Sequence, residues 1–191
     1  MSIDATGTDT VAAHRSSAKG LRDLYYARFG FAIVWAGLIT LAAPALPAVG
    51  VAALVVIYPL FDVAAAVIDY RTSGAEGPRG ALYINMVLSL LAATGLAAAF
   101  TSGIPDVLRV WGIWAITAGI VQLVVAILRY RLGGQWAMIL SGGISVLAGG
   151  SFILQAGGPD ASLSKVVGYA TLGGIFFLIS AIRLHHVIKG Q

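Results

Sequence analysis

The chain has 191 residues, of which 59% are hydrophobic and only 10% are charged, and its mean hydropathy is +0.90. An average soluble domain carries about 25% charged residues, so this composition excludes an ordinary soluble fold. The net charge of +4 does not indicate nucleic-acid binding, because the basic residues flank apolar runs and form no separate basic face.

Six apolar runs fill most of the chain, and crossing a bilayer about 30 Å thick takes ~20 apolar residues in a helix. The runs cover residues 29–46, 48–68, 81–101, 107–128, 136–156 and 165–184. The sequence therefore predicts an all-α polytopic membrane protein with six transmembrane helices. We expect a cytoplasmic N-terminal tail over residues 1–28, a membrane domain over 29–186 and a short cytoplasmic tail over 187–191.

The N-terminal tail contains two kinds of sequence. Residues 1–16 are rich in Ser, Thr, Ala and Asp, a composition that predicts disorder. Residues 21–28 separate apolar from charged side chains at helical spacing. This second pattern is compatible both with a helix lying on the membrane surface and with the start of the first membrane helix.

Basic residues gather at one end of the predicted helices. Ten of them precede the first run, follow the last or lie in the second and fourth connections: Arg15, Lys19, Arg22, Arg28, Arg71, Arg79, Arg129, Arg131, Arg183 and Lys189. Only Arg109 and Lys165 flank the opposite connections. The positive-inside rule then predicts that both termini are cytoplasmic. Aromatic residues are typical of membrane interfaces, which places Trp111, Trp114 and Phe152 toward the outer surface.

The even-numbered runs end in similar polar elements, Asp69-Tyr70-Arg71, Arg129-Tyr130-Arg131 and Arg183-Leu184-His185. Aligning these ends brings Pro59, Gly119 and Gly173 to one equivalent position, where a helix can kink or pack closely. The pattern predicts three parallel helical-hairpin repeats around an axis along the membrane normal. Chance similarity between apolar segments is the alternative.

Small residues at four-residue spacing predict where helices approach closely, because membrane helices associate through van der Waals packing. One stripe lies on the fifth run and consists of Ser141, Ser145 and Gly149. A second stripe on the first run consists of Ala32, Ala36 and Thr40, and a third on the fourth run consists of Ala115 and Gly119.

Three polar residues lie at similar depth within the predicted membrane domain: Asp62, Asn85 and Gln122, with Tyr58 one turn before Asp62. An intramembrane carboxylate is costly to ionise, so Asp62 is a candidate proton carrier or cation ligand. The alternative is a structural role, in which Asp62 forms hydrogen bonds to the other two residues.

The sequence predicts no enzyme, no metal site and no cofactor. It has no cysteine, no metal-binding constellation and no paired acid and base within the apolar runs. The expected partners are the lipid bilayer and either further copies of the chain or other membrane proteins.

Three sequence features together resemble a known family. The first run closes with Gly-Leu-Ile-Thr-Leu-Ala-Ala-Pro over residues 37–44, Gly-Gly-Gln-Trp at 133–136 leads into Gly-Ile-Ser-Val-Leu at 143–147, and the hairpin pattern repeats. Over about residues 25–188 the chain resembles the HdeD-like acid-resistance membrane proteins. This resemblance implies six membrane helices, a location in the bacterial cytoplasmic membrane and a link to acid stress. It implies no catalytic residue, and Asp62 is not part of the pattern.

Two functions follow from these observations. The first is a non-enzymatic inner-membrane protein that supports acid or envelope stress tolerance through packing and partner contacts. The second is a small proton-coupled transporter or channel that uses Asp62, Asn85 and Gln122.

The predicted orientation is testable with single introduced cysteines, since the chain has none of its own. A membrane-impermeant maleimide added outside should label a cysteine at Ser102 and leave cysteines at Ser73 and Gly133 unlabelled, because ten basic residues hold the latter connections inside. Strong labelling at Ser73 or Gly133 with none at Ser102 would show that the orientation is opposite to the predicted one.

Overall fold

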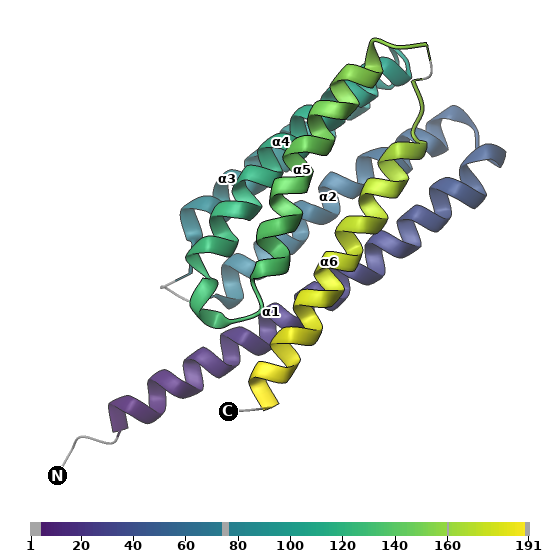
Figure 1. Cartoon of the computed structure of the whole chain (residues 1–191). Helices are drawn as coiled ribbons and strands as arrows, with labels where there is room; N and C mark the ends of the chain where they lie inside the picture. The colour runs from purple at the N-terminus through teal and green to yellow at the C-terminus, as the bar shows by residue number, and fades with distance from the viewer. Residues whose placement is uncertain (1–4, 74–76, 160, 190–191) are drawn as a thin grey trace.

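The computed structural model describes residues 5–73, 77–159 and 161–189, and this part of the chain is helical without any strand (Figure 1). Its long helices are α1 (Ala5–Gly37), α2 (Ala48–Thr72), α3 (Arg79–Ala99), α4 (Ile104–Leu128), α5 (Trp136–Ala156) and α6 (Ser164–Lys189). Together they provide six spans long and apolar enough to cross a membrane, and the first of these runs from Ser16 in α1 to Ala45 beyond it. The predicted all-α membrane fold with six transmembrane helices is therefore confirmed.

The N-terminal segment differs from the sequence-based expectation. α1 is one uninterrupted helix from Ala5, so the predicted disorder over residues 1–16 is wrong from Ala5 onward, and residues 1–4 lie outside the described part. Leu21 and Tyr25 are buried against Met138 and Leu184, which makes residues 21–28 a packed part of the first membrane helix. The burial of this apolar face explains why no separate surface helix forms.

The start of α1 and the end of α6 lie at the same end of the bundle, which we call the terminal end (Figure 1). At the C-terminus α6 continues through Lys189, so the tail expected over residues 187–191 is helical as far as it is described. The shared end follows from an even number of antiparallel spans joined by short connections.

The six helices form a ring in chain order, because each contacts the helix before and after it and α6 closes against α1. The closest pairs are α4 with α5, α1 with α6 and α2 with α3. These pairs join neighbouring hairpins of the predicted repeat, whereas the two helices within each predicted hairpin are packed less closely. The repeat symmetry itself stays a prediction.

Facing small residues explain why α4 and α5 are the closest pair. A Cβ atom added to Gly119 would lie 2.7 Å from the Ser145 Cβ, and one added to Gly142 would lie 2.8 Å from the Gly119 carbonyl oxygen. About two helical turns after Gly142 on α5, Gly149 lies against the backbone of Gly112 on α4. Only residues without a large side chain allow this approach, which increases van der Waals contact in lipid.

The remaining predicted packing positions behave differently from one another. Pro59 is buried inside α2, which continues through it as one helix. Ala32 on α1 faces Gly174 on α6, and a Cβ atom added to Gly174 would lie 3.0 Å from the Ala32 Cβ. Gly173 makes no close approach, since an added Cβ would meet no atom within 4 Å. Thr40, at the end of the stripe on the first run, is exposed.

The expected outer aromatic belt is wrong for its main members. Trp111 is fully buried and Trp114 is 6% exposed, and both lie in the interior of the ring with Trp35 and Tyr58. Their ring centroids are 4.8 to 6.0 Å apart within this aromatic cluster. Aromatic side chains that pack against one another in the centre of the helix bundle bury more surface than they would at a membrane interface.

A pair of adjacent glycines tests the packing of α4 on α5. Gly149→Ala should destabilise the protein by about 1 to 3 kcal/mol, because the new methyl overlaps the Gly112 backbone. Gly150→Ala, whose methyl would meet no atom within 4 Å, should be neutral or slightly stabilising. The measurement is the unfolding free energy in mixed micelles, and equal effects of the two variants would contradict this packing.

Candidate functional site: a polar cavity in the helix ring

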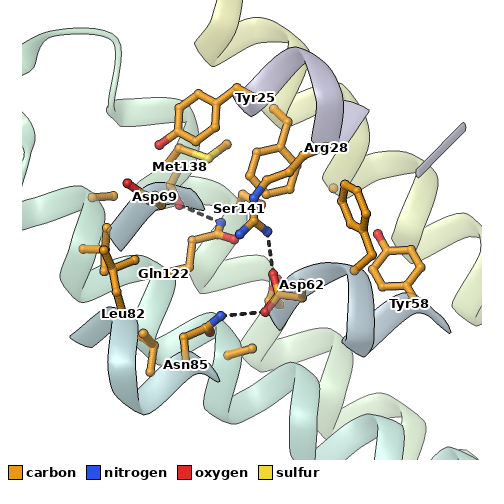
Figure 2. A pocket seen from close by; sticks show the side chains of 18 of the residues that line it. Tyr25, Arg28, Tyr58, Asp62, Asp69, Leu82, Asn85, Gln122, Met138 and Ser141 are labelled. Carbon is orange, nitrogen blue, oxygen red and sulfur yellow. Dashed lines mark hydrogen bonds and ion pairs between the residues drawn. The ribbon is translucent and has the colours of Figure 1, made fainter. Parts of the chain in front are cut away.

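All six helices line a central cavity of about 110 Å³ (Figure 2). Each helix contributes at least one polar side chain: Arg28, Asp62, Asn85, Gln122, Ser141 and Tyr169, in chain order. A volume above ~15 Å³ suffices for one water molecule, so this cavity is large enough for several waters or a small solute. The aromatic cluster borders it through Tyr58 and Trp114.

Asp62 is the centre of the polar contacts in the cavity. Its Oδ1 accepts a hydrogen bond from Arg28 Nη1 at 2.5 Å, and its Oδ2 accepts from Asn85 Nδ2 at 2.6 Å and from the Ser89 hydroxyl at 2.7 Å. Ser89 in turn accepts from the Trp114 indole N–H at 3.0 Å. The carboxylate thereby joins α2 to α1 and α3, and its charge is balanced by a guanidinium.

A second buried ion pair lies nearer the terminal end of α2. Arg129 donates two hydrogen bonds to the Asp69 carboxylate, at 2.7 and 2.8 Å, and a third to the Ser73 hydroxyl at 2.6 Å. Both side chains are under 10% exposed. Burial alone would lower the pKa of Arg129, but the hydrogen bonds and negative charge of Asp69 raise it. Arg129 therefore stays charged and holds α2 to the end of α4.

The two acidic residues share one face of α2. Asp62 and Asp69 are seven residues apart, close to two turns, so both point toward the ring interior. Each has its own arginine partner, and the cavity lining contains two cationic and two anionic side chains. Breaking either pair would leave a buried charge without a partner, which typically costs ~3 to 5 kcal/mol.

The structure brings together part of the cluster expected from sequence. Asp62 and Asn85 form a direct hydrogen bond, but Gln122 donates its Nε2 to the Met138 carbonyl at 3.2 Å instead. Tyr58 lines the same cavity, and its hydroxyl forms no hydrogen bond to any described residue. All four predicted polar residues thus line one cavity, and Asp62 and Asn85 are the pair among them joined by a hydrogen bond (Figure 2).

The small residues predicted for packing also reach this space. Ser141 and Ser145 of α5 line the cavity, as does Gly173 of α6. The Ser145 hydroxyl accepts a hydrogen bond from Tyr169 at 3.1 Å, and Ser141 has no hydrogen-bond partner among the described residues. The stripe on α5 is therefore part of the polar lining as well as of the contact with α4.

Arg28, Ser89 and Arg129 belong to the site but were not expected there. Arg28 and Arg129 were counted as cytoplasmic flanking charges, and both are instead buried ion-pair partners. One sequence signal pointed to them: two acidic residues on one face of an apolar helix require counter-charges from neighbouring helices.

The arrangement limits the chemistry that the cavity can support. The position next to Asp62 where a metal or alkali cation would bind is occupied by the Arg28 guanidinium. The described residues contain no group of three side chains that could hold a metal ion. The groups that the site offers are hydrogen-bond donors and acceptors, the Asp62 carboxylate and the Arg28 guanidinium.

No protein-family model matches the chain, and neither the curated proteins nor the solved structures include a match.

The bidentate contact of Arg129 can be tested against a neighbouring arginine. Arg129→Lys should lower the unfolding free energy by about 1 to 3 kcal/mol, because lysine keeps the charge but cannot form the planar two-bond contact with Asp69. Arg131→Lys, at an exposed position, should change it by less than about 0.5 kcal/mol. Equal stability of the two variants would show that the ion pair does not secure the end of α4.

Proposed function

We propose that this chain is a non-enzymatic integral membrane protein of the HdeD-like type, located in the bacterial cytoplasmic membrane with both termini inside. Its role is to support acid or envelope stress tolerance as a stable helical unit that contacts lipid and other membrane proteins. The observation that supports this proposal best is the complete set of partners around Asp62, which suits a structural connection between three helices.

The surface of the ring suits such contacts. Large apolar side chains cover its outside, and Leu41 and Leu154 are each more than 80% exposed. Apolar groups on the outside and ion pairs on the inside are the distribution expected of a helix bundle surrounded by lipid. Support of stress tolerance comes from the sequence resemblance alone.

The second candidate is a small proton-coupled transporter or channel. One observation favours it: Tyr58 and Ser141 turn hydroxyl groups into the cavity without a hydrogen-bond partner among the described residues. A purely structural core would be expected to satisfy buried polar groups. Hydroxyl groups of this kind are available to water or to a bound solute.

A double-mutant cycle tests the structural role. Arg28→Gln and Asp62→Asn should each cost about 3 to 5 kcal/mol of unfolding free energy, because each leaves a buried charge unpaired. The double variant should recover most of this loss, since it retains polar contacts but no charge. Unfolding in mixed micelles gives the three values, and additive losses would exclude a structural ion pair.

The same double variant separates the two functions. In proteoliposomes, a transporter that depends on Asp62 should lose pH-gradient-driven flux in the folded double variant. If wild-type and double variant both fail to move protons, while a strain carrying the double variant survives acid as the wild type does, the non-transporting role is supported. Loss of acid survival together with loss of flux would favour transport.

A further inference from the structure

We propose that the central cavity binds a small monocarboxylate together with one proton, with Arg28 as the partner of the bound anion and Asp62 as the proton acceptor. The inference deepens the second candidate function by naming a ligand class. Binding itself does not depend on transport, and the two can be measured separately.

The first argument is the unused hydrogen-bonding capacity of Arg28. A guanidinium has five N–H donors, and in this structure one of its nitrogens binds Asp62 while the planar group lies 5.1 Å from the centre of the Phe177 ring. Its other nitrogens form no hydrogen bond to any described residue. A carboxylate is the anion that matches such a planar pair of donors.

The second argument concerns the other groups at the cavity wall. The hydroxyls of Tyr58 and Ser141 are unpaired donors facing the same space, and Phe31, Phe61 and Phe177 form an apolar part of its lining. A ligand with a carboxylate and a short alkyl chain matches both kinds of wall. The volume of about 110 Å³ restricts it to a few heavy atoms.

The third argument is charge balance, which requires a proton to accompany the anion. The cavity already pairs two arginines with two carboxylates, so a bound anion alone would leave one net negative charge in an apolar surrounding. Protonation of Asp62 removes that charge. Neutral Asp62 can still hydrogen-bond to Asn85 and Ser89, and Arg28 becomes free to bind the ligand.

Other titratable groups around Asp62 are less suited to take this proton. They are Tyr25 and Arg28 from α1, Tyr58 and Asp69 from α2, Arg129 after α4 and Tyr169 from α6. α3 and α5 contribute only uncharged polar groups, Asn85, Ser141 and Ser145. The arginines and tyrosines are already protonated at neutral pH, and Asp69 is held by two hydrogen bonds from Arg129.

The test uses the full chain in lipid nanodiscs, with propionate as the probe and propionamide as its neutral analogue. Calorimetry in weakly buffered solution should show one proton taken up per propionate bound. The affinity for propionate should fall about tenfold per pH unit on the alkaline side, because the unprotonated site cannot accept the anion. Propionamide should bind at least about tenfold more weakly, since it offers Arg28 no charge.

Substitutions change the two parts of the site separately. Asp62→Asn should bind propionate without proton uptake and with little pH dependence, because the site then carries an unpaired Arg28. Arg28→Lys should weaken binding by about tenfold, since a point charge replaces the planar donor pair. The control is Arg109→Lys, whose arginine forms an exposed ion pair with Asp106 outside the cavity, and it should bind as the wild type does.

Several outcomes would overturn the inference: propionate binding without proton uptake in the wild type, equal binding of propionamide, or no propionate binding at any pH. If Asp62→Asn does not fold, the inference is still tested by the number of protons that the wild type takes up per propionate and by its weaker binding of propionamide. Propionate binding without flux in proteoliposomes would keep this inference and reject transport. Proton flux without propionate binding would reject this inference and keep transport.

Discussion

The pairing of charges inside an apolar helix ring is the constraint on which the rest of this structure depends. An unpaired carboxylate or guanidinium at this depth costs several kcal/mol, so the acidic residues of α2 determine what its neighbours must supply. Asp62 obtains Arg28 from α1 and amide and hydroxyl donors from α3, and Asp69 obtains Arg129 at the end of α4. Through two side chains, α2 is thereby fixed to three other helices.

The helices around this network are packed at different distances from one another, and the wider spacing on one side leaves the cavity. On one side of the ring, glycines bring α4 and α5 into backbone contact. Elsewhere, large aromatic side chains hold the helices apart, and the cluster of Trp35, Tyr58, Trp111 and Trp114 fills the resulting interior. Between the aromatic cluster and the ion pairs, side chains do not fill the space completely, and polar groups from all six helices face what is left.

A polar network of this kind can serve stability and ligand binding at once. The bonds that secure Asp62 in the paired state are the bonds that a proton and an anion would rearrange, because the two partners of one ion pair could each take a new partner. The free-energy difference between the paired and the ligand-bound arrangement would then depend on charge balance as well as on contact with the apolar part of the wall. In a structural role the Arg28–Asp62 ion pair would predominate, and in a binding role the arrangement with a proton on Asp62 and an anion at Arg28 would. The same residues would take part in both.

The sequence alone determined the membrane class, the number of spans and their approximate bounds, because apolar runs of about twenty residues have few alternatives in a bilayer. It also identified Asp62, Asn85 and Gln122 as polar groups at membrane depth. It could not assign Arg28 and Arg129, since a basic residue at the end of an apolar run has the same local signature whether it faces the cytoplasm or pairs with a buried acid. Likewise, Trp111 and Trp114 near a predicted interface gave no sign that they turn inward. Those assignments depend on how α1 to α6 close into a ring, and only tertiary contacts between residues far apart in the chain decide that.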